Sequence, residues 1–348
     1  MAKAGFATVF TGMPKGYVVP AEDQPHARTF MQWPNNSKVY RDPAFLRMTQ
    51  QTIADIANTI VEFEPVVMLA AKADHGPIRK LVSAQVELWD IPTDDLWCRD
   101  AGPLFAVHNT EGLAISDLNF NGWGNKQVHT HDAKIAMTVA AQMNLLIFDS
   151  YLHGEAGGVE QDGFGTLIAH ESSWVNDNRN AYDKSAVESL LLDAFGASKI
   201  IWANGVKGRD ITDYHIDSLA RFVGESKVLI QLPKSVDPAD PWSVAAFETY
   251  ETLQNATNAN GGKLDIHVIP EPVKPRIKSY DFVASYPNYY VCNGAVIAAE
   301  FGDLETDAIA KAALQDIYPT REIITLNADT LGELGGGIHC ATQQQPAI

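Results

Sequence analysis

Apolar residues recur with a helical period in several separated parts of the chain. The clearest case is the segment from Pro43 to Glu62, where apolar positions fall three or four residues apart. That spacing places them on one face of an α-helix, so an amphipathic helix is predicted. The same pattern predicts further helices over residues 75–83, 132–143, 185–195, 241–255 and 303–317.

Short apolar runs of strand length lie between the predicted helices. Val66–Ala70 is typical of them, and Asn293-Gly294 marks a tight hairpin turn within residues 289–298. The remaining predicted strands lie near residues 86–88, 114–120, 145–148, 166–169, 200–202, 227–231, 264–268 and 323–326, and residues 269–275 are expected to form a surface loop. This alternation of strands and helices recurs about five times and predicts an α/β fold. No linker-like or low-complexity tract interrupts it, so one domain over residues 1–348 is expected.

The chain closes on a glycine run, Gly335–Gly337, followed by a single cysteine, Cys340. Consecutive glycines lose much backbone entropy on folding and suit places where the chain takes unusual angles or passes close to a ligand. A lone cysteine is more often a buried, inert side chain than a nucleophile, so Cys340 needs partners before a catalytic role is indicated. The polar run Thr342–Gln345 that follows does not resemble a core strand.

Candidate partners stand where predicted strands end or where glycines break the pattern. Asp100 is expected at a strand end before Gly102, and Glu155 lies in a glycine-rich loop. His215 and Asp217 fall in a stretch that alternates like a β-strand, in which they would project from one face. Together with Cys340 they supply a thiol, an imidazole and three carboxylates.

The charge balance narrows the possible partners. The 348 residues are 46% hydrophobic, and the formal net charge is −17. An acidic excess argues against nucleic acid and anionic membranes and is compatible with a cationic substrate. No signal peptide is evident, and no apolar run approaches the roughly 20 residues of a membrane span. The three cysteines are too few for a disulfide framework, so a cytoplasmic location is expected.

Two carboxylates, Asp100 and Asp217, have no cationic partner in the sequence. Carboxylates in one cleft repel each other unless a cation lies between them, which suggests a positively charged ligand. A guanidinium group fits because it is planar, permanently charged and suited to paired contacts with carboxylates.

Three other classes of protein use some of these residues. A metal hydrolase could bind its ion through His129 and His131, or through His215 and Asp217. A cysteine peptidase or a transglutaminase-like enzyme would also use cysteine, histidine and aspartate, although those enzymes usually place the cysteine first. A non-catalytic guanidine-binding protein would need the aspartates but not Cys340.

Five motifs taken together resemble the agmatine deiminases, in the peptidylarginine deiminase-like family of the guanidine-modifying superfamily. They are Trp97–Pro103, Glu155–Gly158, Asn176–Asn180, His215–Asp217 and Gly335–Gln344. The resemblance implies a pentein fold, a five-bladed pseudo-symmetric α/β propeller of repeated ββαβ units around a substrate channel. It also implies a homodimer, a small guanidine substrate, and neither a metal nor an organic cofactor.

The resemblance further implies a role for each candidate. Cys340 would attack the guanidinium carbon, with His215 as acid and base and Glu155 orienting His215. Asp100 and Asp217 would hold the guanidinium nitrogens, and Trp97 would line the pocket. Agmatine and water would then give N-carbamoylputrescine and ammonia through a thiouronium intermediate on Cys340. His339 is not expected to be the base, because neighbours in an extended chain face apart.

This chain departs from the family pattern near the site. Tyr214 stands where glycine is expected before the catalytic histidine, and Gly337 stands where asparagine is expected. Ala156 and Gly158 also differ from the usual residues. Tyr214 is expected to contact the tail of the substrate. Arginine, peptidyl-arginine or a guanidino acid are therefore alternatives to agmatine.

Overall fold

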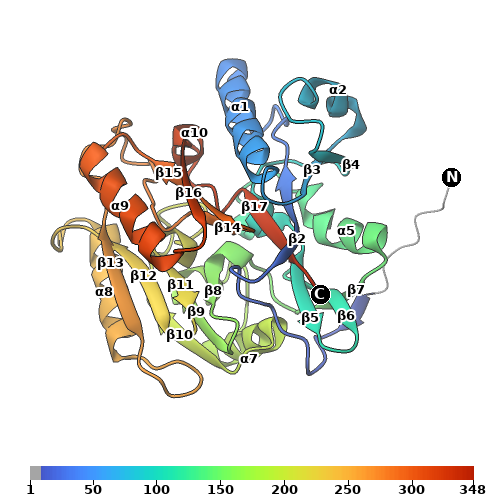
Figure 1. Ribbon diagram of the computed structural model, residues 1–348. Helices are drawn as coiled ribbons and strands as arrows, with labels where there is room; N and C mark the ends of the chain where they lie inside the picture. Colours follow the sequence, from blue (N-terminus) through green and yellow to red (C-terminus); the bar gives the residue numbers. More distant parts are fainter. Residues whose placement is uncertain (1–8) are drawn as a thin grey trace.

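The computed structural model of the protein describes residues 9–348. Residues 1–8, part of the N-terminal stretch in which no signal peptide was expected, lie outside this range. Within the described residues, the strands form five separate sheets of three or four strands each. The longer helices lie on the outside of the molecule, while strands such as β8, β11 and β14 lie nearer its centre (Figure 1).

Each sheet is built from the same strand–strand–helix–strand unit. The first two strands of a unit pair antiparallel, and the strand after the helix joins the second strand in parallel. The units that follow one another along the chain are β5 (Leu104–His108), β6 (Gly112–Asp117), α5 (Ile135–Met143) and β7 (Leu146–Asp149); β8 (Val159–Gln161), β9 (Thr166–His170), α7 (Lys184–Phe195) and β10 (Lys199–Ala203); β11 (Ala220–Gly224), β12 (Lys227–Leu232), α8 (Pro241–Asn255) and β13 (Asp265–Pro270); β14 (Tyr290–Cys292), β15 (Ala295–Glu300), α9 (Leu304–Ile317) and β16 (Glu322–Asn327). β1 (Val9–Thr11) adds a parallel edge strand to the first of these.

The fifth unit joins the two ends of the chain. β17 (Thr342–Pro346) pairs antiparallel with β2 (His26–Gln32), and α1 (Pro43–Ile60) connects β2 to the parallel strand β3 (Val66–Ala70). β4 (Glu87–Asp90) extends this sheet. Figure 1 shows β17 lying beside β2 although the two strands are more than three hundred residues apart. Five ββαβ units confirm the expected pentein architecture.

The prediction that residues 342–345 do not form a core strand is wrong. All five residues of β17 are buried. Some of their polar groups find partners inside the protein: Gln343 Nε2 donates to the Pro103 carbonyl at 3.0 Å, and Gln344 Oε1 accepts from Arg99 Nη1 at 2.8 Å. Buried polar side chains are tolerated where such bonds are made, so a polar sequence can still form an interior strand.

Local signals place most of the longer helices correctly. Helices α1, α7 and α8 each begin after an aspartate whose side chain accepts a hydrogen bond from a backbone amide, the usual N-cap arrangement. Two predictions need correction. The helix expected over residues 75–83 is confined to α2 (His75–Ile78) after the short turn η1 (Lys72–Asp74), and β13 runs to Pro270 into the expected loop.

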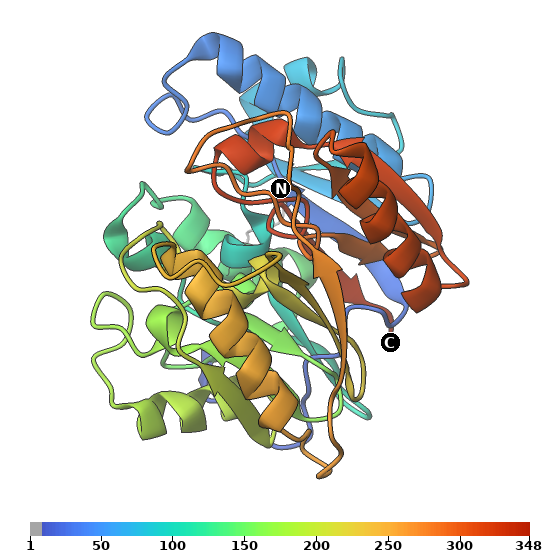
Figure 2. The ribbon, with the colours of Figure 1, turned by 90° about the vertical axis from the view of Figure 1, so that its left-hand side faces the viewer.

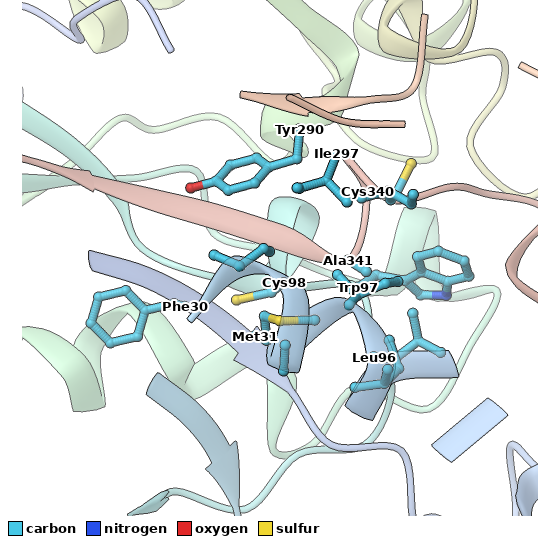
Figure 3. Packing of buried hydrophobic residues seen from close by; sticks show 14 of the residues in the cluster. Phe30, Met31, Leu96, Trp97, Cys98, Tyr290, Ile297, Cys340 and Ala341 are labelled. Carbon is cyan, nitrogen blue, oxygen red and sulfur yellow. The ribbon is translucent and has the colours of Figure 1, made fainter. Parts of the chain in front are cut away.

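The apolar faces of the units form three hydrophobic clusters, and the largest reaches the end of the chain. It includes Phe30, Met31, Cys98, Cys340 and Ala341. In Figure 3 the sulfur of Cys340 points away from the side chains of Cys98 and Met31. Figure 2 shows the helices of successive units on the periphery, with the strands inside. None of the helices within residues 9–348 is long and apolar enough to cross a bilayer.

The closing strand offers a test of this architecture. A chain ending at Ala341 loses the five residue pairs between β17 and β2. At about 1 kcal/mol for each net hydrogen bond, and with the burial of five residues also lost, the cost approaches the roughly 5–15 kcal/mol that stabilises a whole domain. We expect this chain to lose cooperative thermal unfolding in circular dichroism. A control chain ending at Pro346 keeps β17 and should unfold like the full chain; equal unfolding of both would contradict the closure.

Candidate active site

The candidate residues lie at equivalent places in the repeated units. In each unit, a short turn leads into the first strand, and these turns carry the chemistry. Asp100 lies in the turn α3 (Cys98–Ala101) before β5, Glu155 precedes η3 (Ala156–Gly158) before β8, and His215 precedes η4 (Ile216–Ser218) before β11. Cys340 precedes β17 in the same way. The turn η3 contacts both α3 and η4, so the repeat brings distant residues to one place.

Two local predictions about these turns are wrong. Asp100 is not at a strand end but in a single helical turn, closed by the Gly102 amide donating to the Cys98 carbonyl at 2.9 Å. His215 and Asp217 do not lie on a strand, because a 3-10 turn forms between them. Ser218 Oγ donates to the His215 carbonyl at 2.8 Å and holds this turn closed.

The His215 imidazole lies between two carboxylates. Its Nε2 is 3.0 Å from Glu155 Oε2, and its Nδ1 is 3.7 Å from Asp100 Oδ1. Burial alone would lower the pKa of His215, but Asp100, Glu155 and Asp217 outweigh it and raise the pKa to about 9. His215 is therefore an imidazolium at neutral pH and can donate a proton.

A second layer of charges holds Glu155. The Arg179 Nε lies 3.0 Å from both carboxylate oxygens of Glu155, and Arg179 Nη1 lies 2.8 Å from Asp213 Oδ2. Burial raises the pKa of Glu155, but Arg179 and His215 lower it more strongly, so the net shift is downward. Glu155 is thus kept as a carboxylate beside His215.

The two aspartates have opposite pKa shifts. Burial, together with Glu155 and Asp217, raises the pKa of Asp100 to about 6, against the lowering effect of His215. For Asp217, burial also acts to raise the pKa, but the hydrogen bond and charge of His339 lower it overall. Two neighbouring carboxylates of this kind favour a cation between them.

Three buried polar atoms have no hydrogen-bond partner among the described residues, and two of them, on Asp100 and His215, border one space. They are Asp100 Oδ1, Asp217 Oδ1 and His215 Nδ1. The space exists because residue 157 is glycine: a Cβ there would lie 2.8 Å from Asp100 Oδ1, 2.9 Å from His215 Nδ1 and 3.1 Å from Asp217 Oδ2. The two aspartate oxygens are unsatisfied buried acceptors, which are costly, so they are suited to a ligand that donates hydrogen bonds and carries positive charge.

Cys340 borders the same group of residues. Its Sγ lies 3.5 Å from Asp217 Oδ2, and Asn288 contributes its Nδ2 at 3.2 Å and its Oδ1 at 3.4 Å. Burial, Asp217 and Asp100 raise the pKa of the Cys340 thiol well above its usual value. A cation bound beside these carboxylates would offset their charge and favour the thiolate.

Asn288 is a site residue that the sequence interpretation missed. It lies just before β14, the one unit whose entrance supplied no candidate. The ββαβ repeat is the signal that could have found it, because every other unit contributes a residue from that position. Gly337 also accommodates Asn288, since a Cβ at residue 337 would lie only 2.4 Å from Asn288 Oδ1.

Trp123 is a second residue that was missed. Its indole Nε1 donates to Asp100 Oδ2 at 2.9 Å. The turn α4 (Gly122–Asn125) that carries it has positive φ at all four positions, including 55° at Trp123. A left-handed conformation costs roughly 1–2 kcal/mol for a residue with a side chain. Packing of the ring on Phe120, at 5.0 Å between centroids, helps to hold it.

Trp97 and Tyr214, both expected to line the pocket, lie in different surroundings. Trp97 lies against the glycine run, since a Cβ at Gly336 would come 2.5 Å from its ring. The Tyr214 ring instead packs in another cluster, 4.7 Å from His170 and 4.8 Å from Trp242 between ring centroids. The expected contact between Tyr214 and the substrate stays a prediction. Its φ of 70° explains why glycine is expected there, because glycine adopts positive φ without strain.

His129 and His131, the first pair considered as metal ligands, each contact an oxygen atom of the protein. His129 Nδ1 is 2.8 Å from the Gln127 carbonyl, and His131 Nδ1 is 3.0 Å from Asp94 Oδ1. Over residues 9–348, no group of three or more histidine, cysteine, aspartate or glutamate side chains is arranged to hold a metal ion.

Comparisons with known proteins agree with this arrangement. Residues 18–346 match the family described as Porphyromonas-type peptidyl-arginine deiminase. A putative agmatine deiminase of Streptomyces coelicolor is 33% identical, covering 94% of this chain and 98% of that protein. The agmatine deiminase of Medicago truncatula is 32% identical, covering 96% and 97%.

Solved structures give the same result for the fold. The agmatine deiminase of Enterococcus faecalis matches with a TM-score of 0.89 at 25% identity, covering 98% of this chain and 99% of that one. An agmatine deiminase of C. jejuni with substrate bound matches with a TM-score of 0.82 at 25% identity, covering 95% and 96%. An amidinotransferase from Microseira wollei, at 11% identity and a TM-score of 0.52, covering 94% and 96%, shares the fold alone.

The hydrogen bond from Trp123 to Asp100 can be tested by titration. A bond to a charged acceptor contributes about 1.5–3 kcal/mol, and one pKa unit corresponds to about 1.4 kcal/mol. Trp123→Phe should therefore raise the pKa of Asp100 by about one unit, measured by carboxyl-carbon NMR, because the carboxylate loses a donor. Trp89→Phe removes an indole that donates to Glu87 and should leave Asp100 unchanged. An unshifted Asp100 in Trp123→Phe would show that the bond does not stabilise the carboxylate.

Proposed function

The chain belongs to the Porphyromonas-type peptidyl-arginine deiminase family, and from this premise we infer that it is an agmatine deiminase. The enzyme is a hydrolase that acts on a C–N bond of the guanidinium group. It converts agmatine and water to N-carbamoylputrescine and ammonia. The observation that supports this most strongly is the set of three unpaired buried atoms, on Asp100, Asp217 and His215, beside the Cys340 sulfur.

Substrate binding follows from the unpaired carboxylate oxygens. The planar guanidinium would enter the space left by Gly157 and donate hydrogen bonds to Asp100 Oδ1 and Asp217 Oδ1. Its positive charge relieves the repulsion between these carboxylates and lowers the pKa of the neighbouring Cys340 thiol. Binding therefore creates the nucleophile at the place where it is used.

The first half of the reaction forms a carbon–sulfur bond. The Cys340 thiolate adds to the guanidinium carbon and gives a tetrahedral intermediate. The His215 imidazolium then donates its proton to one amino nitrogen, and the C–N bond to that nitrogen breaks. Ammonia leaves, a thiouronium group remains on Cys340, and His215 is neutral. Glu155, held by Arg179, keeps the ring of His215 in place.

The second half of the reaction breaks the carbon–sulfur bond. Neutral His215 takes a proton from water, and the resulting hydroxide adds to the thiouronium carbon. The second tetrahedral intermediate collapses as the carbonyl forms and the Cys340 thiolate leaves, and the hydroxyl proton passes to solvent, where the released ammonia becomes ammonium. The product head is a neutral ureido group, so the electrostatic attraction that held the substrate is lost.

Agmatine is favoured over the other guanidines by the relatives that are named for it. The reason to doubt it was Tyr214, and that ring packs away from the site against His170 and Trp242. Arginine carries a carboxylate in addition to the tail amine of agmatine, peptidyl-arginine carries peptide groups there, and a guanidino acid has a carboxylate in place of the amine. Agmatine carries two positive charges, on its guanidinium and its amine, and the net charge of −17 also favours it over these alternatives.

The setting of the enzyme is a further part of the proposal. We expect one catalytic unit over residues 1–348, because site residues come from all five sheets in the described part. The three buried free cysteines, Cys98, Cys292 and Cys340, fit a reducing cytoplasm. A homodimer is proposed from the family resemblance.

The nucleophile can be tested with Cys340→Ser. The variant should bind agmatine, because Asp100 and Asp217 remain, but should release no ammonia, because a serine hydroxyl is not activated in this site. Ammonia release is measured across agmatine, arginine, peptidyl-arginine and guanidinobutyrate, with Cys98→Ser as the control that keeps the nucleophile. Turnover of Cys340→Ser at the wild-type rate would overturn the mechanism. A preference of the wild-type enzyme for arginine would overturn the substrate.

A further inference from the structure

His339, the residue before the nucleophile, bridges two carboxylates. Its Nδ1 lies 2.8 Å from Asp217 Oδ2, and its Nε2 lies 2.9 Å from Glu22 Oε2. Ionised carboxylates accept hydrogen bonds and do not donate them, so each contact is a hydrogen bond in which the ring nitrogen donates. His339 therefore links Glu22 directly to the aspartate that faces the substrate.

Glu22 comes from the segment before β2 and lies outside all five repeated units. Its side chain is only 9% exposed, and its carboxylate lies 2.9 Å from Arg99 Nη2 and 3.1 Å from Arg221 Nη2. We call Glu22, Arg99, Arg221 and His339 the Glu22 charge network. Burial raises the pKa of Glu22, but Arg221, His339 and Arg99 outweigh it and hold the pKa well below its usual range.

The network lies between the catalytic residues and a cavity. Glu22, Arg99, Arg221 and His339 all line a cavity of about 280 Å³, whereas Cys340 and Asp217 do not line it. The cavity wall also includes residues from the first strand of every unit, namely β5, β8, β11, β14 and β17. His339 is thus the connection from this interior network to the substrate side.

The charges alternate from the arginines to the substrate. Arg99 and Arg221 are followed by Glu22, then His339, then Asp217, and a bound guanidinium would continue the series. Glu22 has Arg99 and Arg221 on one side and His339 on the other, whereas Asp217 gains a cation on its second side only when the substrate is present. Removing the charge of Glu22 would leave His339 with one carboxylate contact in place of two.

We propose that Glu22 and His339 are positioning residues for the guanidinium, acting through Asp217. By holding Oδ2 of Asp217 with a charged donor, His339 keeps the carboxylate ionised and its Oδ1 free for the substrate. Glu22 holds the other ring nitrogen of His339 and so fixes the orientation of the ring. This inference rests on the proposed deiminase function, because it assigns the network a role in binding the cationic head.

A buried histidine–glutamate pair elsewhere in the protein provides the comparison for a purely structural role. His26 Nδ1 lies 3.1 Å from Glu64 Oε1, and Glu64 also contacts Thr29 and Tyr290. None of these partners is a residue of the candidate site. Glu64→Gln should therefore lower stability without changing how the enzyme distinguishes a charged ligand from a neutral one.

The experiment compares two ligands that differ in the charge of the head group. Agmatine and N-carbamoylputrescine share the tail, but agmatine carries a guanidinium and N-carbamoylputrescine a neutral ureido group of similar shape. Their affinities are measured by calorimetry for Cys340→Ser, so that neither ligand is consumed. Glu22→Gln, Glu22→Asp and Glu64→Gln are then added in that background, and thermal unfolding is recorded for each.

Glu22→Gln should lower the affinity for agmatine about tenfold, which corresponds to about 1.4 kcal/mol, and change the affinity for N-carbamoylputrescine by no more than about twofold. Glu22→Asp retains the charge and should recover most of the loss. If Glu22→Gln does not fold, Glu22→Asp and His339→Gln provide the comparison, and His339→Gln should show the same selective loss.

Unchanged or tighter agmatine binding in these variants would overturn the inference, as would an equal loss for both ligands. Failure of the Cys340→Ser parent to bind agmatine would instead overturn the proposed function, and the positioning role with it. The two failures are therefore distinguishable.

Discussion

The repulsion between buried carboxylates is the constraint on which the site depends. Asp100, Asp217 and Glu155 lie within one region, and burial acts to raise the pKa of each. Arg179 offsets this for Glu155 and His339 for Asp217, but Asp100 keeps a pKa of about 6. The protein thus leaves the charge of Asp100 without a full counter-charge, and the free oxygen Oδ1 of Asp100 faces the space beside Gly157. A guanidinium completes the set, and the same cation activates the thiol that attacks it.

The fold supplies this constraint through repetition. Each ββαβ unit begins with a turn, and the first strand holds that turn against its neighbours. Residues far apart in the chain, such as Asp100, Asn288 and Cys340, reach one site without any long catalytic loop. The unit that contains β17 and β2 joins the ends of the chain. The position of Cys340, which precedes β17, therefore depends on the pairing of this last strand with β2. Glu22, from outside the units, connects this site to the interior of the molecule.

Much of this could be predicted from the sequence because helical periods and apolar strands are local signals. Residues 241–255 and the Asn293-Gly294 hairpin were located in this way. Tertiary contacts decide what local pattern cannot. The polar strand β17 can be buried because its glutamines form hydrogen bonds with the Pro103 carbonyl and the Arg99 guanidinium. The residues around His215 alternate like a strand but form a turn, which the hydroxyl of Ser218 closes. Asn288 and Trp123 carry no distinctive chemistry alone, so only their contacts with Cys340 and Asp100 identify them.

The central claim is that the unpaired oxygens of Asp100 and Asp217 are the guanidinium site. The most direct measurement is a crystal structure of Cys340→Ser with agmatine. We predict guanidinium nitrogens at hydrogen-bond distance from Asp100 Oδ1 and Asp217 Oδ1, with the guanidinium carbon facing residue 340. A guanidinium bound instead in the cavity lined by Glu22 and Arg221, or in contact with neither aspartate, would contradict the account.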